Sequence, residues 1–390
     1  MKKLDQYALS VKSAATIALN ARAHEMQSRG KDVINFSIGE LDCPIPAEAK
    51  KAVIKALNEN RNKYTPAAGL PELREAVAKK FRKENGIECG AENVIISNGA
   101  KHSIFNAFAA IIERDDEVII PKPAWFSYEE QLKFLGGKTV FAETGNDFEI
   151  RADLIGDKIT SRTKAIVINS PCNPTGMVIK KKELEKIADI AVEKDLYVVS
   201  DEIYENFVYE GEKHFSIASL GKEIAERTIT INGASKSYAM TGFRIGYLAC
   251  NDEIAKVIER VQSQITSNPS SLSQYACIGA LGGGRKFSVK VAADLDKRRK
   301  YVLKALSGID GIGVGKPKGA FYVMPRVEKH YKGKIKGSTD FSEFLLEKAL
   351  LMTVPGIEFG EDKCIRLSYS LSMGDIKTGM ERLEKVLHSK

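Results

Sequence analysis

The stretch TITINGASKSYAMTGFRIGYLAC, residues 228–250, holds a single lysine in a polar connection between two apolar segments. The segments at 228–232 and 246–250 predict strands, because β-branched and aromatic residues favour a buried, extended chain. Lys236 lies between two serines in the connection, and Arg244 follows it eight residues later. Such a lysine is either a solvated loop charge or a reactive amine, and its surroundings in the fold decide which.

Five earlier segments have the same apolar, β-branched character and alternate with helical patterns. Strands are predicted at 93–97, 117–120, 138–142, 164–170 and 196–201, and apolar residues at helical spacing lie between them at 100–112, 125–135 and 182–195. Strands that alternate with helices predict βαβ units, and strands that are apolar throughout are covered on both faces. The chain is therefore expected to be α/β, with a three-layer αβα large domain built on a mostly parallel sheet.

From about residue 290 the pattern changes to charged amphipathic helices and short strands. Helices are predicted at 295–308, 340–352 and 374–387, and strands at 319–325 and 364–370. This predicts a smaller α+β domain, built from the N-terminal segment and the C-terminal part. The expected divisions are 1–45 for the N-terminal arm and part of the small domain, 46–290 for the large domain, and 291–390 for the small C-terminal domain.

The composition argues against several kinds of partner. The net charge of +8, from 59 basic and 51 acidic residues, is spread along the chain, whereas nucleic-acid binders gather it in a patch. The six cysteines and five histidines lack metal-ligand spacing, so no metal site is expected. The N-terminus has no signal-peptide pattern, and no window approaches the ~18 apolar residues of a membrane span. Free thiols suit a reducing compartment. The expectation is a cytoplasmic protein without nucleic-acid or membrane partners.

Polar and reactive residues follow the predicted strands, at the sheet edge where open α/β folds bind ligands. Successive strand ends lead into NGAKHS at 98–103, PKPAWF at 121–126, PCNPTG at 171–176, Asp201 with Tyr204 three residues on, and GASKS at 233–237. Each alone has a structural explanation: Asp201 could cap a helix, Trp125 could be core, and Asn173 could cap its own turn. Together they fit a flat, phosphorylated, nitrogenous aldehyde that a lysine binds covalently.

Pyridoxal phosphate has these requirements. Its aldehyde forms a Schiff base with a lysine, and its ring nitrogen works as an electron sink when a carboxylate keeps it protonated. Its phosphate needs hydroxyl, guanidinium and helix N-terminal donors, which Ser235, Arg244 and the NGAK loop can supply.

Six sequence motifs resemble those of a known enzyme family, and the resemblance covers essentially the whole chain. They are YTPAAGLPELREAVA (64–78), NGAKHSIFNA (98–107), NSPCNPTG (169–176), SDEIYENFVY (200–209), SKSYAMTGFRIGY (235–247) and IRLSYS (365–370). In this order they resemble the class I/II aminotransferases of the aspartate aminotransferase family, which have the pyridoxal-phosphate fold type I. The resemblance implies that the large domain binds this cofactor.

The resemblance also implies a role for each matching position. Lys236 would form the Schiff base and, once released by substrate, move the proton between the substrate Cα and the cofactor carbon. Asp201 would pair with the ring nitrogen, and Asn173 and Tyr204 would hydrogen-bond the ring hydroxyl oxygen. Trp125 would stack on the ring. Lys236, Asp201 and Tyr204 would thus be the catalytic residues.

The phosphate and the substrate carboxylate would have further ligands. The implied phosphate ligands are Gly99, Ala100, Ser235 and Arg244, and Lys101 adds a charge beside them. Tyr64 would reach the phosphate of the partner subunit, so that a homodimer shares its active sites. Arg366 would clasp the substrate α-carboxylate with a bidentate pair, helped by the backbone of Gly39 and by Trp125 and Asn173.

Substrate choice depends on positions where this chain departs from the usual family pattern. The segment GELDC at 39–43 has Leu41 and Cys43 where the family usually has proline and an aromatic residue. Many relatives have a hydroxyl residue where this chain has Lys101. In one prokaryotic subgroup such a lysine pairs with the distal carboxylate of an acidic substrate, and Thr16 matches a substrate-contacting position there. Ser263 stands where another subgroup supplies an arginine from the partner.

The resemblance therefore implies a homodimeric aminotransferase that moves the amino group of an acidic L-amino acid, with aspartate favoured, to 2-oxoglutarate. Alternatives within the fold are an aminotransferase of broader, aromatic or prephenate specificity, and a β-lyase. A non-catalytic binder, such as the aminotransferase-like half of a transcription regulator, would need a DNA-binding module before the domain. Only about 45 residues precede the predicted large domain, and they resemble the enzyme's own N-terminal arm.

Overall fold

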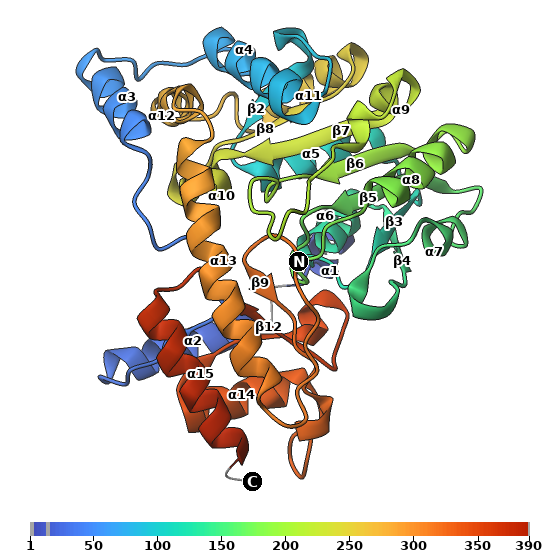
Figure 1. The fold of residues 1–390 in the computed structure, drawn as a ribbon. Coiled ribbons are helices and arrows are strands. Elements are labelled where there is room, and N and C mark those ends of the chain that lie inside the picture. The colour runs from blue at the N-terminus through green and yellow to red at the C-terminus, as the bar shows by residue number, and fades with distance from the viewer. Residues whose placement is uncertain (1–3, 13–15, 389–390) are drawn as a thin grey trace.

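The computed structural model describes residues 4–12 and 16–388, and a seven-stranded sheet forms the centre of its larger part (Figure 1). The strands are β2 (Val94–Ser97), β3 (Glu117–Pro121), β4 (Lys138–Ala142), β5 (Thr163–Asn169), β6 (Tyr197–Asp201), β7 (Thr228–Gly233) and β8 (Gly246–Ala249). Their order across the sheet is β2-β8-β7-β6-β5-β3-β4, and only β8 runs antiparallel to its neighbours. The seven strands predicted from the sequence, and the mostly parallel sheet, are confirmed.

Alternate residues of these strands face two helical layers, which is why the strands are apolar throughout. Val118 and Val167 pack against one layer, formed by α5 (Ala100–Ile111), α6 (Ser127–Leu135) and α11 (Asp252–Ile265). Ile119 and Ile166 face the other layer, with α7 (Ala152–Gly156), α8 (Lys181–Glu193) and α9 (Lys222–Arg227). On that second face α4 (Pro71–Lys80), α12 (Ser271–Gly282) and α3 (Ala47–Asn58) cover β2 and β8. The three-layer αβα architecture is confirmed.

The smaller part joins the two ends of the chain around one core (Figure 1). An antiparallel sheet has the order β11-β12-β9, with β9 at Tyr322–Val323, β11 at Val354–Pro355 and β12 at Ile365–Ser368. Its helices are α2 (Thr16–Ser28), α13 (Lys286–Ser307), α14 (Ser338–Ala349) and α15 (Met373–His388). Phe36 packs in the same cluster as Leu345 and Ile376, so the N-terminal segment helps to build the small domain, as expected. Helix α13 crosses the division expected at 290/291.

One predicted helix ends earlier than expected. The pattern at 340–352 predicted a helix through Met352, but α14 ends at Ala349 and Leu350 takes a left-handed conformation with φ 56°. Leu351 and Met352 form strand β10, which pairs in parallel with β1 (Ile34–Asn35). The pairing with a segment more than 300 residues away overrides the local helical pattern.

The N-terminal arm lies against the large domain. Helix α1 (Gln6–Ser10) packs beside α6, and the backbone N–H of Lys12 donates a 2.6 Å hydrogen bond to Glu130. A turn of π-helix, η1 (Phe81–Asn85), extends α4, and Gly86 follows it in a left-handed conformation with φ 67°. Over residues 4–12 and 16–388, no helix has both the length and the apolar character needed to cross a membrane.

Candidate active site

A cavity of about 510 Å³ lies at the carboxyl ends of the parallel strands, and residues of the smaller part also line it. Eleven of the residues singled out in the sequence line it: Gly39, Ala100, Lys101, Trp125, Asn173, Asp201, Tyr204, Ser235, Lys236, Arg244 and Arg366. Its volume is typical of small-molecule and cofactor sites. Residues far apart in the sequence thus meet at the sheet edge where α/β folds bind ligands.

Gly99 and Tyr64 are not among the lining residues, and the side chain of Thr16 is not described. Gly99 immediately precedes the cavity-lining start of α5, and a Cβ added there would come within 2.4 Å of the Arg244 guanidinium. Tyr64 does not line the cavity, and it is 90% exposed. Thr16 begins α2, but its side chain lies outside the described part of the chain.

Lys236 lies in the single helical turn α10 (Ala234–Ser237), directly after β7. Its ammonium donates a hydrogen bond to the backbone oxygen of Gly39. Burial, followed by repulsion from Arg366, lowers the pKa of Lys236 to about 8. An amine with this pKa is partly neutral near physiological pH, and only the neutral form is a nucleophile or a base.

Asp201 ends β6 and is 3% exposed. Its carboxylate accepts a 2.6 Å hydrogen bond from the Tyr128 hydroxyl and a 3.2 Å bond from the backbone N–H of Ile203. Burial raises the pKa of Asp201 to about 6, against the lowering effect of these two hydrogen bonds. Among the described residues no cation pairs with it within 4 Å. A buried carboxylate of this kind is costly, and such groups cluster at functional sites where a cationic ligand partners them.

The amide of Asn173 and the phenol of Tyr204 extend this group of polar side chains. The backbone N–H of Asn173 donates to Asn169 at 2.8 Å, and its side-chain oxygen accepts from Arg366 at 2.9 Å. The Tyr204 hydroxyl lies 2.9 Å from that of Tyr322, and burial raises the pKa of Tyr204. These contacts fix the orientation of both side chains toward the cavity.

The start of α5 meets β8 at one corner of the cavity. We call the group Gly99, Ala100, Ser235 and Arg244 at this place the anion-binding corner. Gly246 allows a close approach, because a Cβ there would lie 2.2 Å from the backbone nitrogen of Ala100. Arg244 is held in a left-handed conformation, φ 54°, and its guanidinium donates to Thr241 O at 2.9 Å. Buried Ser235 lines the same cavity. Helix N–H groups, a hydroxyl and a guanidinium are the donors that a phosphate needs.

Arg366, on β12, faces the cavity from the small domain. Its Nη2 donates to Ser37 O at 2.7 Å, and its guanidinium stacks 4.4 Å from the centre of the Tyr322 ring. Its Nε is buried and has no hydrogen-bond partner within the described chain. Arg366 itself lines the cavity, and the planar donors of a guanidinium are suited to a carboxylate ligand.

The cavity has an excess of positive charge. Its cationic side chains are Lys101, Lys236, Arg244 and Arg366, and its carboxylates are Glu40 and Asp201. The Lys101 ammonium lies 4.7 Å from the Trp125 ring centre. Burial, followed by repulsion from Arg244, lowers the pKa of Lys101. An anionic ligand in the cavity would oppose this lowering, because an opposite charge nearby favours the ammonium form.

Sequence reasoning missed several residues that line the cavity, among them Ser37, Tyr128, Asn169 and Tyr322. Tyr128 lies at helical spacing in α6, and Tyr322 lies in a short strand, so both resembled core residues. Asn169 is the polar last residue of an apolar strand, and a polar residue at that position could have signalled a site.

Comparisons with known proteins agree over nearly the whole chain. The family described as aminotransferase class I and II matches residues 31–383. A probable aspartate/prephenate aminotransferase of Aquifex aeolicus is 44% identical over 381 residues, 97% of this chain and 96% of that protein. An aspartate aminotransferase of Bacillus sp. (strain YM-2) is 41% identical over 375 residues, 95% and 96% of the two chains. A solved structure of the Thermus thermophilus aspartate aminotransferase with maleate has a TM-score of 0.93 and 40% identity, over 99% of this chain and 100% of that one.

Proposed function

The chain belongs to the aminotransferase class I and II family, and on that premise we propose that it binds pyridoxal 5'-phosphate and transfers an amino group from an acidic L-amino acid, with aspartate favoured, to 2-oxoglutarate. The observation that carries the proposal is the meeting of Lys236, Asp201 and Arg366 in one cavity. They provide an amine of lowered pKa, a buried carboxylate, and a guanidinium, and within the described residues the carboxylate pairs with no cation and one guanidinium donor has no partner.

The residues present fit the cofactor. Asp201 would face its ring nitrogen, Asn173 and Tyr204 its ring hydroxyl, and Trp125 its ring face. The anion-binding corner formed by Gly99, Ala100, Ser235 and Arg244 would hold its phosphate. When bound, pyridoxal phosphate supplies an aldehyde that takes up amino groups and a ring that accepts electrons. Asp201 would keep the ring nitrogen protonated, and Lys236 would remove and return the proton at the substrate Cα.

An acidic substrate is supported by charge. Arg366 would bind the α-carboxylate, beside the backbone of Gly39, and Lys101 would pair with the distal carboxylate. The excess of cations in the cavity suits a cofactor phosphate together with a dicarboxylate. Maleate, bound in the solved Thermus structure, is itself a dicarboxylate. The name of the Aquifex relative supports one alternative, an enzyme that also accepts prephenate.

The proposal also includes the oligomeric state, the domain divisions, the cellular location and the small-molecule partners. The exposed Tyr64 supports a homodimer in which it reaches the partner's cofactor phosphate. We also propose a cytoplasmic location and a substrate contact of Thr16. The proposed domain divisions are 1–45, 46–290 and 291–390. Free amino and 2-oxo acids would be the small-molecule partners.

A panel of amino acids tests the substrate assignment. Each would be mixed with the cofactor-loaded enzyme without an oxo acid, and the absorbance of the bound cofactor followed over time. Aspartate and glutamate should react faster than alanine or phenylalanine. The Lys101→Ser variant should lose about tenfold or more of its preference for aspartate over alanine, because one charged contact is removed. Full aspartate preference in this variant would contradict the role of Lys101.

A matched control comes from Lys164, whose ammonium lies 6.0 Å from the Tyr197 ring centre near the opposite end of the sheet. The Lys164→Ser variant should keep the preference of the original enzyme. A β-lyase would instead release ammonia, so ammonia is assayed in every reaction.

A further inference from the structure

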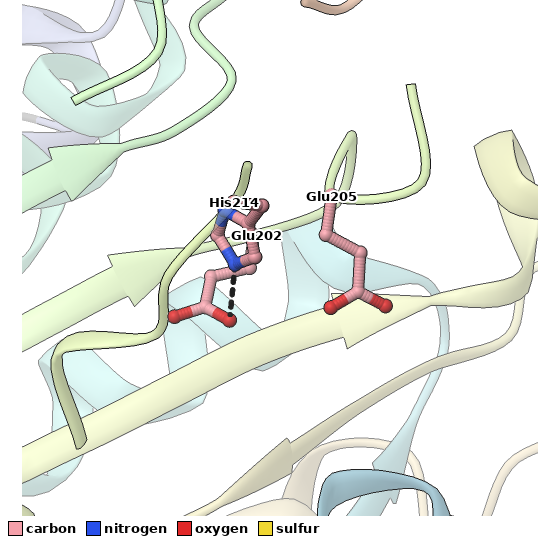
Figure 2. A group of neighbouring side chains, drawn as sticks. All are labelled: Glu202, Glu205 and His214. Atoms are coloured by element: carbon pink, nitrogen blue, oxygen red, sulfur yellow. Dashed lines mark hydrogen bonds and ion pairs between the residues drawn. The ribbon is translucent and has the colours of Figure 1, made fainter. Parts of the chain in front are cut away.

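A second group of polar side chains is buried behind the cavity, on the segment that follows β6. Residues 200–206 are all buried, and their side chains point in two directions. Asp201 and Tyr204 line the cavity, whereas Glu202 and Glu205 are not among its lining residues. Glu202 contacts His214 (Figure 2), and Glu205 contacts Lys80. One turn of chain therefore holds both the catalytic side chains and the buried glutamates.

Glu202 is almost completely enclosed by hydrogen-bond donors. One carboxylate oxygen accepts from Ser200 at 2.9 Å and from Ser216 at 2.7 Å. The other accepts from Asn85 at 3.1 Å and lies 3.0 Å from Nε2 of His214. Its side chain is 1% exposed, and a buried carboxylate is tolerated only when it is hydrogen-bonded in this way.

Glu205 forms a buried ion pair with the Lys80 ammonium. Its second oxygen accepts a 2.6 Å hydrogen bond from the Asn85 amide, whose own oxygen accepts from Lys80 at 2.7 Å. Asn85 thus donates to both glutamates and accepts from the lysine, so its amide orientation is fixed. The π-helical turn η1 ends at Asn85, and such turns occur often at functional sites.

These contacts argue against a metal site at this position. Glu202, Glu205 and His214 offer ligand atoms within 4.8 Å of one another (Figure 2). However, all four carboxylate oxygens already accept hydrogen bonds, and the Lys80 ammonium supplies the positive charge. A metal ion would have to displace that ammonium. The cluster is better explained as a fixed network than as an ion site.

The network also reaches the two ionisable groups of the active site. The Asn206 amide donates a 2.9 Å hydrogen bond to Ser237, the residue after Lys236. Glu202 adjoins Asp201, and its charge is among the influences that raise the pKa of Asp201, after burial. Loosening the network would therefore move both the position and the charge balance of the catalytic side chains.

We propose that Lys80, Asn85, Glu202 and Glu205 form a positioning network that holds Asp201 and Tyr204 against the cofactor ring. None of these four residues is among those that line the cavity, and they act through the backbone of 200–206 and through the charge of Glu202. The inference rests on the proposed function, since it assigns the network to the same cofactor site.

The test compares variants of the cofactor-loaded enzyme. Asn85→Leu keeps the side-chain size and removes the amide that links both glutamates, and Glu205→Gln removes one charge of the pair. The matched control is Glu117→Gln. Glu117 is also a buried carboxylate, ion-paired with Arg162 and hydrogen-bonded to Thr160. It is the first residue of β3, whereas the cavity lies at the carboxyl ends of the parallel strands. For each variant one measures the thermal midpoint, the dissociation constant for pyridoxal phosphate, the absorbance spectrum of the bound cofactor, and kcat and KM for aspartate.

The two network variants should bind the cofactor about tenfold more weakly, with an altered spectrum and a kcat at least about tenfold lower, because small displacements of catalytic groups are costly. KM for aspartate should change less than about threefold, because Arg366 is not touched. The control should lose only stability. Network variants whose spectrum, cofactor affinity and kcat match those of the control would overturn the proposal.

A milder variant covers the case in which these two fail to fold. Ser216→Ala removes one hydrogen bond to Glu202 and should shift cofactor affinity and kcat in the same direction by about twofold to fivefold. Unchanged values would again overturn the proposal. If the unsubstituted protein binds no pyridoxal phosphate, the proposed function itself is wrong. If that protein binds the cofactor and the variants behave like it, only the positioning network is wrong.

Discussion

The Tyr128 hydroxyl donates a 2.6 Å hydrogen bond to the Asp201 carboxylate, and both of these buried residues line the cavity. Burial raises the pKa of Asp201, and the bond from Tyr128 opposes that rise by stabilising the ionised carboxylate. Tyr128 therefore helps to keep a negative charge where the protonated ring nitrogen of the cofactor would lie.

Replacing Tyr128 with phenylalanine removes this bond and keeps the ring. The pKa of Asp201 should rise further, so the carboxylate becomes protonated at a higher pH than about 6. Loss of a hydrogen bond to a charged group costs about 1.5–3 kcal/mol, and cofactor affinity should fall by about tenfold or more. The acid limb of the pH profile of kcat/KM should move to higher pH. A Tyr197→Phe variant, changed at the start of β6, should behave like the original enzyme.

The buried Asp201 also has a consequence for stability. Its pKa is about 6 in the folded protein, against 3.8 for an aspartate free in water, so the folded state holds the proton more tightly than the unfolded chain does. The stability of the cofactor-free protein should therefore fall as pH rises from about 4 to 6 and stay lower above that range. The cofactor-free Asp201→Asn variant should be more stable than the original by about 1–3 kcal/mol at pH 8, with no difference below pH ~4. Urea unfolding at several pH values measures this, and equal stability at pH 8 would be the contrary result.

A substitution at Gly246 tests the packing of the anion-binding corner. A methyl group at this position would lie 2.2 Å from the Ala100 nitrogen and would push the start of α5 away from β8. Gly246→Ala should lower stability by about 1–3 kcal/mol and weaken cofactor binding more than it weakens the fold. Gly242→Ala is the matched control, because a Cβ at Gly242 meets no atom within 4 Å. If both variants bound pyridoxal phosphate equally well, the corner would not hold the phosphate.

The lowered pKa of Lys236 predicts a pH-dependent rate of cofactor uptake. Below about pH 8 the ammonium form dominates and cannot attack an aldehyde, so uptake by the cofactor-free protein should speed up with rising pH and level off above 8. Arg366 contributes to the lowering, after burial. In an Arg366→Met variant the rate should therefore level off at a higher pH. Stopped-flow absorbance measures the uptake, and an unchanged midpoint in the variant would show that Arg366 does not tune Lys236.

The central sheet could be predicted because its strands are apolar on both faces and regularly separated by helices. The lining of the cavity could be predicted for residues at strand ends, since the strand order places those ends together. Asp201, Asn173 and Lys236 illustrate this, and the family resemblance added Arg366, which the small domain supplies.

Contacts that depend on three-dimensional packing could not be predicted. Leu351 and Met352 pair with Ile34 and Asn35, which lie more than 300 residues away in the sequence. No local sequence pattern predicts such a two-residue strand. Tyr128 has the spacing of a core residue in its helix, and only the structure shows its hydroxyl bonded to Asp201. The hydrogen bonds of Asn85 to two glutamates likewise depend on a π-helical turn that nothing in the sequence indicated.

The most direct test of the proposed function is the fate of the amino nitrogen. The cofactor-loaded enzyme would be given ¹⁵N-labelled L-aspartate and 2-oxoglutarate, and the products would be quantified by mass spectrometry. We expect ¹⁵N-glutamate and oxaloacetate in equal amounts, no labelled ammonia, and no turnover in the Lys236→Ala variant. Labelled ammonia in place of ¹⁵N-glutamate, or turnover that survives the loss of Lys236, would contradict the proposed function.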